Sequence, residues 1–119
     1  MKIAVTSTGK DLDSPVDPRF GRAAYILIVD TDTMAVDVLN NAANVNAFKG
    51  AGIQAATMIG DSRADVLLTG YCGPNAFKTL AAARIKVAGE VSGTVREALA
   101  AFNAGRLTFE SKPNVDGHW

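Results

Sequence analysis

The sequence has few of the residues that build metal centres and covalent cross-links. Among 119 residues there is one cysteine, Cys72, and one histidine, His118. A single cysteine excludes a disulfide within the chain, and neither a CxxC nor an HxxxH pair occurs, so the chain alone does not provide the usual ligands of a zinc site. His118 stands next to the final Trp119, where we expect a solvated chain end.

The chain also lacks an excess of charge and a long apolar run. It has 12 Lys plus Arg and 12 Asp plus Glu, so any attraction for anions must be local rather than a property of the whole molecule. No run approaches the roughly 18 apolar residues of a membrane span, and the first apolar segment is too short for a secretory signal. We therefore expect a cytoplasmic protein that binds neither nucleic acid nor membranes.

What is present is an alternation of short apolar runs and amphipathic segments. With 48% hydrophobic residues, the chain suits one soluble domain. The unbroken run at 24–30 predicts a strand that is covered on both faces, and the alternation at 34–39 predicts a half-exposed edge strand. Further strands are expected at 3–6, 66–69 and 85–88, and helices at 53–59, from Pro74 onward, and between a Thr94 cap and a Gly105 stop.

Strands that alternate with helices predict an α/β fold, a mainly parallel sheet with helices on both faces. An early hairpin makes the second strand antiparallel, and the expected strand order is 3-2-1-4-5. We expect a single domain over residues 1–107. Beyond residue 107 the periodicity stops, and the tail, 108–119, either is disordered or folds back. The edge strand could pair with a second copy or be protected by Asp37, so a monomer or a weak dimer is expected.

In this strand order the second and third strands lie on one side of the first strand, and the fourth and fifth lie on its other side. Ligands of open α/β sheets bind at such a topological switch point, here between the first and fourth strands. Two loops would meet there, at residues 7–22 and 70–75. The first contains DPRFGRAAY, which is longer than a simple turn requires. The second contains GYCGPNA and leads into a helix. The switch point therefore predicts a site formed by these two loops.

The two loops carry groups that are suited to anions. Arg19 and Arg22 are permanently charged donors, Gly21 permits a close approach of backbone, and Phe20 adds an apolar wall. The second loop adds unpaired N–H groups at a helix start. Neither loop contains a histidine, so no acid–base or nucleophile–base pair can be named. The candidate binding residues are Ser7, Arg19, Phe20, Gly21, Arg22, Tyr71, Cys72, Gly73, Pro74 and Asn75.

Each of these residues also has a purely structural interpretation. The arginines could form surface ion pairs with Asp13, Asp17 or Asp30, Phe20 could fill the core, and Cys72 could be a small buried apolar residue. Two other classes of function remain as alternatives. A phosphoryl-transfer enzyme would need strand-borne carboxylates, which residues 3–5 and 66–68 lack. A regulatory domain would use PRFGRA to contact a protein partner.

Several segments carry a resemblance to a known family. The segments LDSPVDPRFGRAAYILIVD, GAGIQAA, TGYCGPNAF and GTVREALAAFNAGRL resemble the dinitrogenase iron-molybdenum cofactor biosynthesis proteins over residues 1–107. Within that family, VDPRFGRAAY and NAANVNAFKGAGIQAA are most similar to the orange proteins of sulfate-reducing bacteria. The turn after the fourth strand often lacks cysteine in the family, so Cys72 is either incidental or a copper ligand in this member alone.

The resemblance implies a ribonuclease H-like, three-layer α/β/α fold with a five-stranded mixed sheet. It implies a non-catalytic carrier of metal–sulfur clusters. For an orange protein the cargo would be a molybdenum-copper sulfide cluster held without a covalent bond, and for the nitrogenase accessory members it would be the iron-molybdenum cofactor or its precursor. The resemblance also suggests, as partners, ATPases of cluster assembly or cell division.

Overall fold

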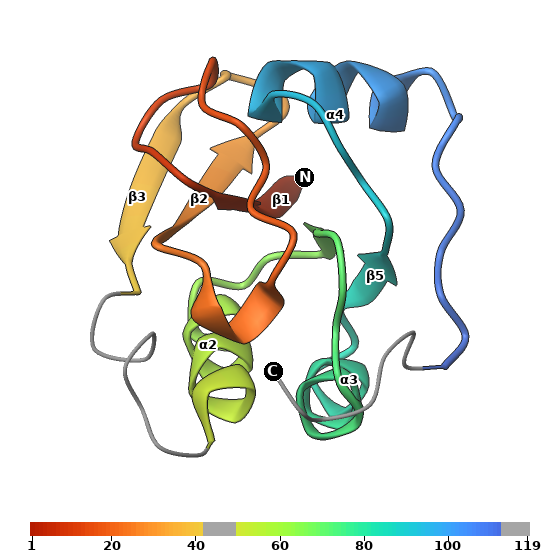
Figure 1. Ribbon diagram of the computed structural model, residues 1–119. Coiled ribbons are helices and arrows are strands. Elements are labelled where there is room, and N and C mark those ends of the chain that lie inside the picture. The colour runs from red at the N-terminus through yellow and green to blue at the C-terminus, as the bar shows by residue number, and fades with distance from the viewer. Residues whose placement is uncertain (42–49, 113–119) are drawn as a thin grey trace.

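The computed structural model describes residues 1–41 and 50–112. Most of the segment before the helix expected at 53–59 lies outside these residues, as do His118 and Trp119. Within the described chain the order of elements follows the predicted alternation of strands and helices. Figure 1 shows the elements around a central sheet.

The sheet contains the strands β1 (Lys2–Ser7), β2 (Tyr25–Asp30), β3 (Val36–Asn40), β4 (Val66–Leu68) and β5 (Lys86–Ala88). Their spatial order is β3-β2-β1-β4-β5, as predicted. β1 pairs in parallel with β4 and β4 with β5, whereas β2 is antiparallel to both of its neighbours. The first, third, fourth and fifth strands therefore all end at one edge of the sheet. We call it the carboxyl edge.

Burial of the strands follows their apolar content. The four central residues of β2, Ile26 to Val29, are buried, which confirms that the unbroken apolar run is covered on both faces. β3 is half-exposed, as expected of an edge strand. It begins two residues later than predicted, because Met34 adopts a left-handed conformation (φ 60°) in the turn that joins it to β2. The Met34 N–H donates to the Asp30 carbonyl at 2.7 Å and closes that turn.

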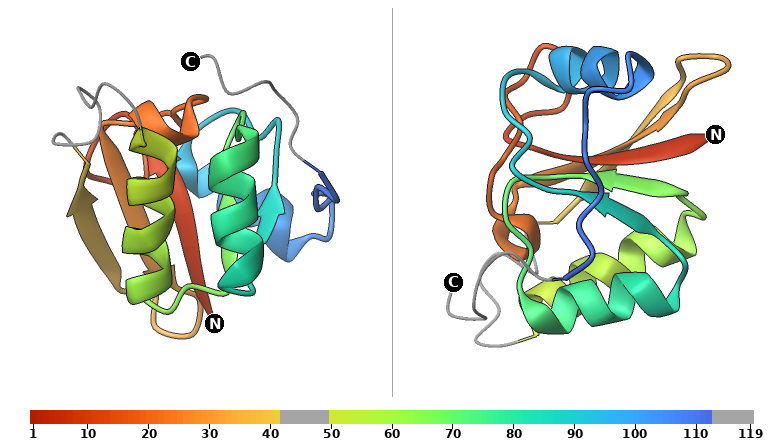
Figure 2. Two further views of the ribbon diagram at one scale, coloured as in Figure 1. Left: turned by 90° about the horizontal axis from the view of Figure 1, so that it is seen from below. Right: turned by 90° about the vertical axis from the view of Figure 1, so that its right-hand side faces the viewer.

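Two helices, α2 (Ala51–Asp61) and α3 (Pro74–Ala82), cover one face of the sheet. Figure 2 shows them side by side, with a third helix, α4 (Val95–Asn103), alone on the opposite face. Ile59 and Leu80 pack with Ile26 and Leu67 in the core beneath α2 and α3. Val95 and Leu99 of α4 pack with Val5 and Leu27 in a second core. The molecule is thus a three-layer α/β/α sandwich.

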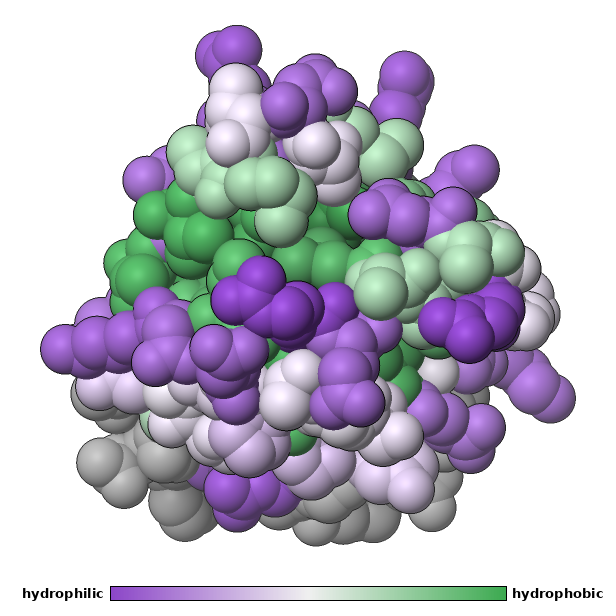
Figure 3. All heavy atoms as spheres, turned by 90° about the horizontal axis from the view of Figure 1, so that it is seen from above, coloured by the Kyte–Doolittle hydropathy of each residue, from purple (hydrophilic) through white to green (hydrophobic). Residues whose placement is uncertain are grey.

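The face that carries α4 is only partly covered. Seen from that side, apolar atoms form a continuous area bordered by polar side chains (Figure 3). Val38 of β3 is 41% exposed, while Val36 is partly buried against the core on this side. In the described chain, no helix is long and apolar enough to cross a membrane.

The first part of the tail lies against the edge of the sheet. Phe109 forms a bridge with Ala88 of β5, and the Glu110 N–H donates to the Val87 carbonyl at 2.7 Å. The Phe109 ring also contacts Phe102 of α4, with 6.4 Å between ring centroids. Phe109 and Glu110 therefore pair with β5.

Candidate anion-binding site

The two loops that the sequence singles out meet at the carboxyl edge. After β1 the chain makes an excursion and returns at Val16, which bridges Ser7, and then reaches a short 3₁₀ helix, η1 (Phe20–Arg22). The Tyr71 N–H donates to the Pro18 carbonyl at 2.7 Å, and the Phe20 N–H donates to the Tyr71 carbonyl at 3.2 Å. Backbone hydrogen bonds thus join residues 18–20 directly to the loop after β4.

Gly70 permits this junction. A Cβ at this position would lie 2.5 Å from the Pro18 Cα and 2.6 Å from its carbonyl oxygen. Both atoms belong to backbone, which cannot move aside as a side-chain end can. The glycine is therefore required by the close approach of the two loops.

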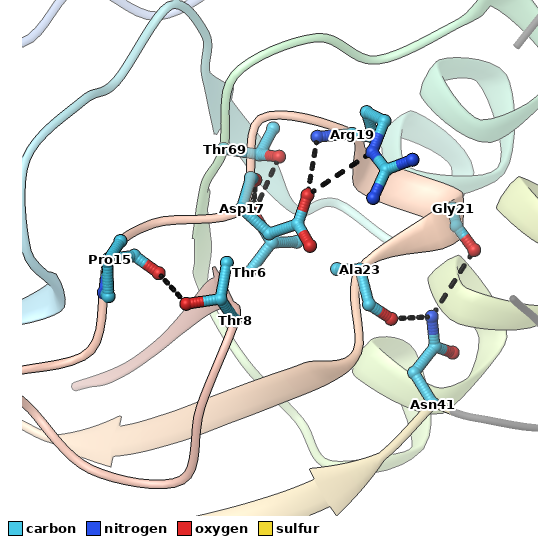
Figure 4. A network of polar contacts seen from close by, with 9 residues as sticks. All are labelled: Thr6, Thr8, Pro15, Asp17, Arg19, Gly21, Ala23, Asn41 and Thr69. Carbon is cyan, nitrogen blue, oxygen red and sulfur yellow. Dashed lines mark hydrogen bonds and ion pairs between the residues drawn. The ribbon is translucent and has the colours of Figure 1, made fainter.

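A buried hydroxyl pair connects the ends of β1 and β4 beneath the junction. The Thr6 Oγ1 lies 2.8 Å from the Thr69 Oγ1 and donates to the Asp17 carbonyl at 2.7 Å (Figure 4). Because Thr6 has one hydroxyl proton, Thr69 must be the donor between the two threonines. Both threonines are fully buried. The pair fixes the loop to the strands on which it rests.

Asp17 holds the start of the arginine segment. Its carboxylate Oδ1 accepts the Arg19 N–H at 3.1 Å and lies 3.7 Å from the Arg19 Nε. The Asp17 side chain is 5% exposed and that of Arg19 is 53% exposed, so the pair joins a buried anion to a solvent-facing cation. In the described structure the two terminal guanidinium nitrogens of Arg19 form no ion pair, and they remain available to a ligand.

Small residues bring η1 against the first turn of α2, and α2 against the first turn of α3. A Cβ on Gly21 would lie 2.6 Å from the Gly52 nitrogen, and a Cβ on Gly52 would lie 2.9 Å from the Ala76 Cβ. The sequence indicated that Gly21 allows a close approach of backbone, and the backbone that approaches is that of α2. Arg19, which precedes η1, and Arg22, within it, consequently flank a turn that packs on the first turn of α2.

The N-termini of α2 and α3 differ from that of α4. Neither α2, which follows Gly50, nor α3, which follows Gly73, has a side-chain cap in the described chain. α4, in contrast, has a capping box in which Thr94 and Glu97 exchange hydrogen bonds. Uncapped N–H groups and the helix dipole favour an anion at the ends of α2 and α3.

Asn41, at the end of β3, fixes η1 from the other side. Its Nδ2 donates to the Ala23 carbonyl at 2.8 Å and to the Gly21 carbonyl at 3.3 Å (Figure 4). The side chain is fully buried. Asn41 therefore determines the orientation of the turn that carries Arg19 and Arg22.

The structure divides the ten predicted binding residues into two groups. Ser7, Phe20 and Cys72 are buried beneath the edge, where Ser7 bonds to the Gly9 backbone and Phe20 packs in the α2–α3 core. Gly21 packs against α2. The residues that reach the surface at least in part are Arg19, Gly21, Arg22, Tyr71, Gly73, Pro74 and Asn75.

Cys72 is a neutral thiol in this environment. It is 2% exposed and packs in the core beneath α2 and α3. Burial raises the pKa of the Cys72 thiol from its usual value of 9.0 to about 12. The thiolate, which is the form that binds metals, is therefore disfavoured in the folded protein at neutral pH.

The described residues contain no group of three or more His, Cys, Asp or Glu side chains that could hold a metal ion. The edge thus offers cations and N–H donors, but no set of ligands with which to assemble a metal centre. What it can do chemically is bind an anion that is already formed.

Three residues that shape this site are not distinctive in the sequence. Asp17 resembled the turn-forming carboxylates Asp11 and Asp13, Asn41 resembled the asparagines of the following loop, and Gly70 resembled an ordinary turn residue. Only Gly70 had a signal of position, because it immediately follows the strand predicted at 66–69. Their contacts depend on the tertiary fold.

Comparisons with known proteins agree with this architecture. Residues 1–105 match the model of the family described as dinitrogenase iron-molybdenum cofactor. The apo form of the orange protein from Desulfovibrio gigas is 48% identical, with a TM-score of 0.94 and 96% of each chain covered. A protein from Thermotoga assigned as NifB is 37% identical, with a TM-score of 0.84 and 98% of each chain covered.

A protein from Methanocaldococcus jannaschii assigned as a dinitrogenase shares the fold at 18% identity, with a TM-score of 0.70 and 95% of this chain and 97% of that chain covered. A comparison with curated proteins finds no match. The fold and the family match define a small α/β/α protein of a class associated with metal clusters. The chain belongs to the dinitrogenase iron-molybdenum cofactor family.

Proposed function

We propose that this chain is a non-catalytic carrier that binds an anionic, molybdenum-containing metal–sulfur cluster at the carboxyl edge. The observation that carries the proposal is the convergence of Arg19, Arg22 and the uncapped N-termini of α2 and α3 on the junction of the two loops. Family membership supports a metal-cluster binding role in general.

The absence of a ligand set among the described residues favours a cluster that brings its own sulfides. In a molybdenum-copper sulfide cluster the soft metals are already coordinated by sulfur. The protein then supplies positive charge, N–H donors and a wall that excludes water. Arg19 provides the terminal nitrogens of its guanidinium group, the helix starts provide N–H groups, and the 38%-exposed Tyr71 provides an aromatic side chain.

A second cargo is favoured by the family model, whose description refers to the iron-molybdenum cofactor. That cofactor or its precursor would use the same cations and helix N-termini. With a molybdenum-copper cargo, Cys72 is our candidate for a copper ligand, and its burial requires that the loop at 71–73 open before the thiol can reach the metal.

The test is reconstitution of the apo-protein with tetrathiomolybdate and Cu(I). We expect a visible charge-transfer band that stays with the protein through gel filtration, with molybdenum and copper in the same fraction. Colour that separates with the small molecules would contradict the molybdenum-copper proposal. Isolated iron-molybdenum cofactor, added in parallel, distinguishes the second cargo.

Arg19→Gln tests whether this edge holds the cargo. We expect an about tenfold weaker affinity, since one charge-assisted contact contributes about 1.4 kcal/mol. The matched control is Arg84→Gln, which removes an exposed arginine that follows the C-terminal end of α3, at the opposite edge. Equal losses in the two variants would show that general charge, and not the carboxyl edge, holds the cluster.

A further inference from the structure

We propose that Asp17 is an internal counter-ion that weakens the hold of this site on its cargo by competing for Arg19. The proposal rests on the proposed function, because it concerns the regulation of affinity at the same edge. Asp17 forms an ion pair with Arg19, the arginine that precedes η1.

The position of Asp17 is fixed. Its N–H donates to the Thr6 carbonyl at 2.9 Å, and its carbonyl accepts the Thr6 hydroxyl at 2.7 Å. Thr6 belongs to the buried part of β1. The backbone of Asp17 is therefore anchored to β1, and its buried carboxylate is held in place by the Arg19 N–H.

Burial makes the carboxylate effective against an anion. With 5% of its side chain exposed, Asp17 is poorly screened by water and salt, and its Oδ1 lies 3.7 Å from the Arg19 Nε. The Asp17–Arg19 pair has no net charge. An anion bound to the outer nitrogens of Arg19 thus shares the guanidinium charge with the carboxylate behind it.

A site built only for tight binding would leave Arg19 uncompensated. The local turn does not require a charge, because a neutral Asn side chain accepts the same Arg19 N–H that Asp17 Oδ1 accepts at 3.1 Å. A carrier, however, must release its cargo, and weaker binding is expressed mainly as faster dissociation. The buried charge of Asp17 then serves to speed the release of the cargo.

The test compares the wild type with Asp17→Asn, loaded with tetrathiomolybdate and Cu(I). We expect Asp17→Asn to bind about tenfold more tightly in a visible titration. We also expect it to pass its colour about tenfold more slowly to apo-protein fixed on a resin. The matched control is Asp13→Asn, which removes a charge from the same loop at a position that pairs with Arg96; its affinity should equal that of the wild type.

A double variant shows whether Asp17 acts through Arg19. In the Arg19→Gln background, Asp17→Asn should change the affinity by less than about twofold. Asp17→Ser, which also accepts the backbone N–H, provides a second uncharged variant if Asp17→Asn does not fold.

The outcomes are separable. Weaker binding by Asp17→Asn would show that the carboxylate orients Arg19 for the cargo, and unchanged binding would show that it is only part of the turn; either result overturns the inference and leaves the proposed function intact. If the wild type retains no colour, or if Arg19→Gln binds as the wild type does, the proposed function fails and the inference fails with it.

Discussion

Cys72 shows how burial sets the chemistry of a single side chain beside the candidate site. Its thiol is 2% exposed, and burial raises its pKa to about 12. In the unfolded chain the thiol ionises near pH 9.0, so the folded state retains a proton that the unfolded state loses as the pH rises. The contribution of this raised pKa to the stability of the folded state is fully present below pH 9 and is lost between pH 9 and about 12.

We therefore predict that the free energy of unfolding falls with rising pH over this window by about 1.4 kcal/mol per unit from this group alone. The measurement is urea unfolding between pH 8 and 11, for the wild type and Cys72→Ala. Because every other ionisable group is common to both proteins, the difference between the two curves isolates the thiol. Parallel curves would contradict the assignment of a buried, neutral thiol.

Gly70 provides a second prediction at the scale of a residue. Gly70→Ala places a methyl group 2.5 Å from the Pro18 Cα, so we expect a loss of stability of about 2 kcal/mol and a weaker hold on an anion, since the two loops must separate. The control is Gly60→Ala in α2, whose Cβ would lie 3.7 Å from the Ala83 Cβ. That change should stabilise the protein by about 1 kcal/mol. Thermal unfolding of both variants measures the contrast.

Single residues were predictable from the sequence where their chemistry is distinctive. Arg19 and Arg22 stand out because two permanent charges flank a phenylalanine and a glycine in one loop. Asp17 does not stand out, because turns commonly contain aspartate. Only the return of the loop to β1, through the bonds between Asp17 and Thr6, buries this carboxylate and gives it influence over Arg19.

At the scale of elements, the predicted strands and helices are present, and their ends are where prediction was least exact. Thr94 and Gly105 were correctly identified as the cap and stop of α4, because capping depends on local sequence. η1 was not predicted as a helix. Its short turn depends on Asn41, which lies about twenty residues away in the chain and donates to the Gly21 and Ala23 carbonyls.

Asn41→Ala should disturb η1 specifically. The substitution removes the donor of the Gly21 and Ala23 carbonyls, and the bond to Ala23 is buried. We therefore expect the free energy of unfolding to fall by about 2 kcal/mol. We also expect cluster binding to weaken by about fivefold, or about 1 kcal/mol, because the turn that carries the arginines loses its orientation.

Thr94→Ala is the comparison, because it removes the cap of α4 on the opposite face of the sheet and should cost about 1 kcal/mol. Its affinity for the cluster should equal that of the wild type. Urea unfolding and a visible titration of both variants separate stability from binding. A matching loss of affinity in Thr94→Ala would show that the site responds to overall stability and not to η1.

At the scale of the whole molecule, the strand order and the three layers follow from the alternation of strands and helices. The switch between β1 and β4 then places residues 18–22 and 70–75 together, and the bridge between Arg19 and Tyr71 confirms that the two loops adjoin. The position of the tail cannot be predicted from the sequence, because a segment without periodicity gives no indication of its neighbour. Its pairing with β5 arises from the free edge of the sheet.

The central claim is that an anionic cluster is held at the carboxyl edge by guanidinium groups and helix N-termini. The most direct measurement is a titration of ¹⁵N-labelled protein with tetrathiomolybdate and Cu(I), followed by amide chemical shifts. We predict that the largest changes fall at residues 19–22, 51–53 and 71–76, with α4 unaffected. Changes centred on α4 or on the strand pair β2–β3, with residues 19–22 and 71–76 unmoved, would contradict the account.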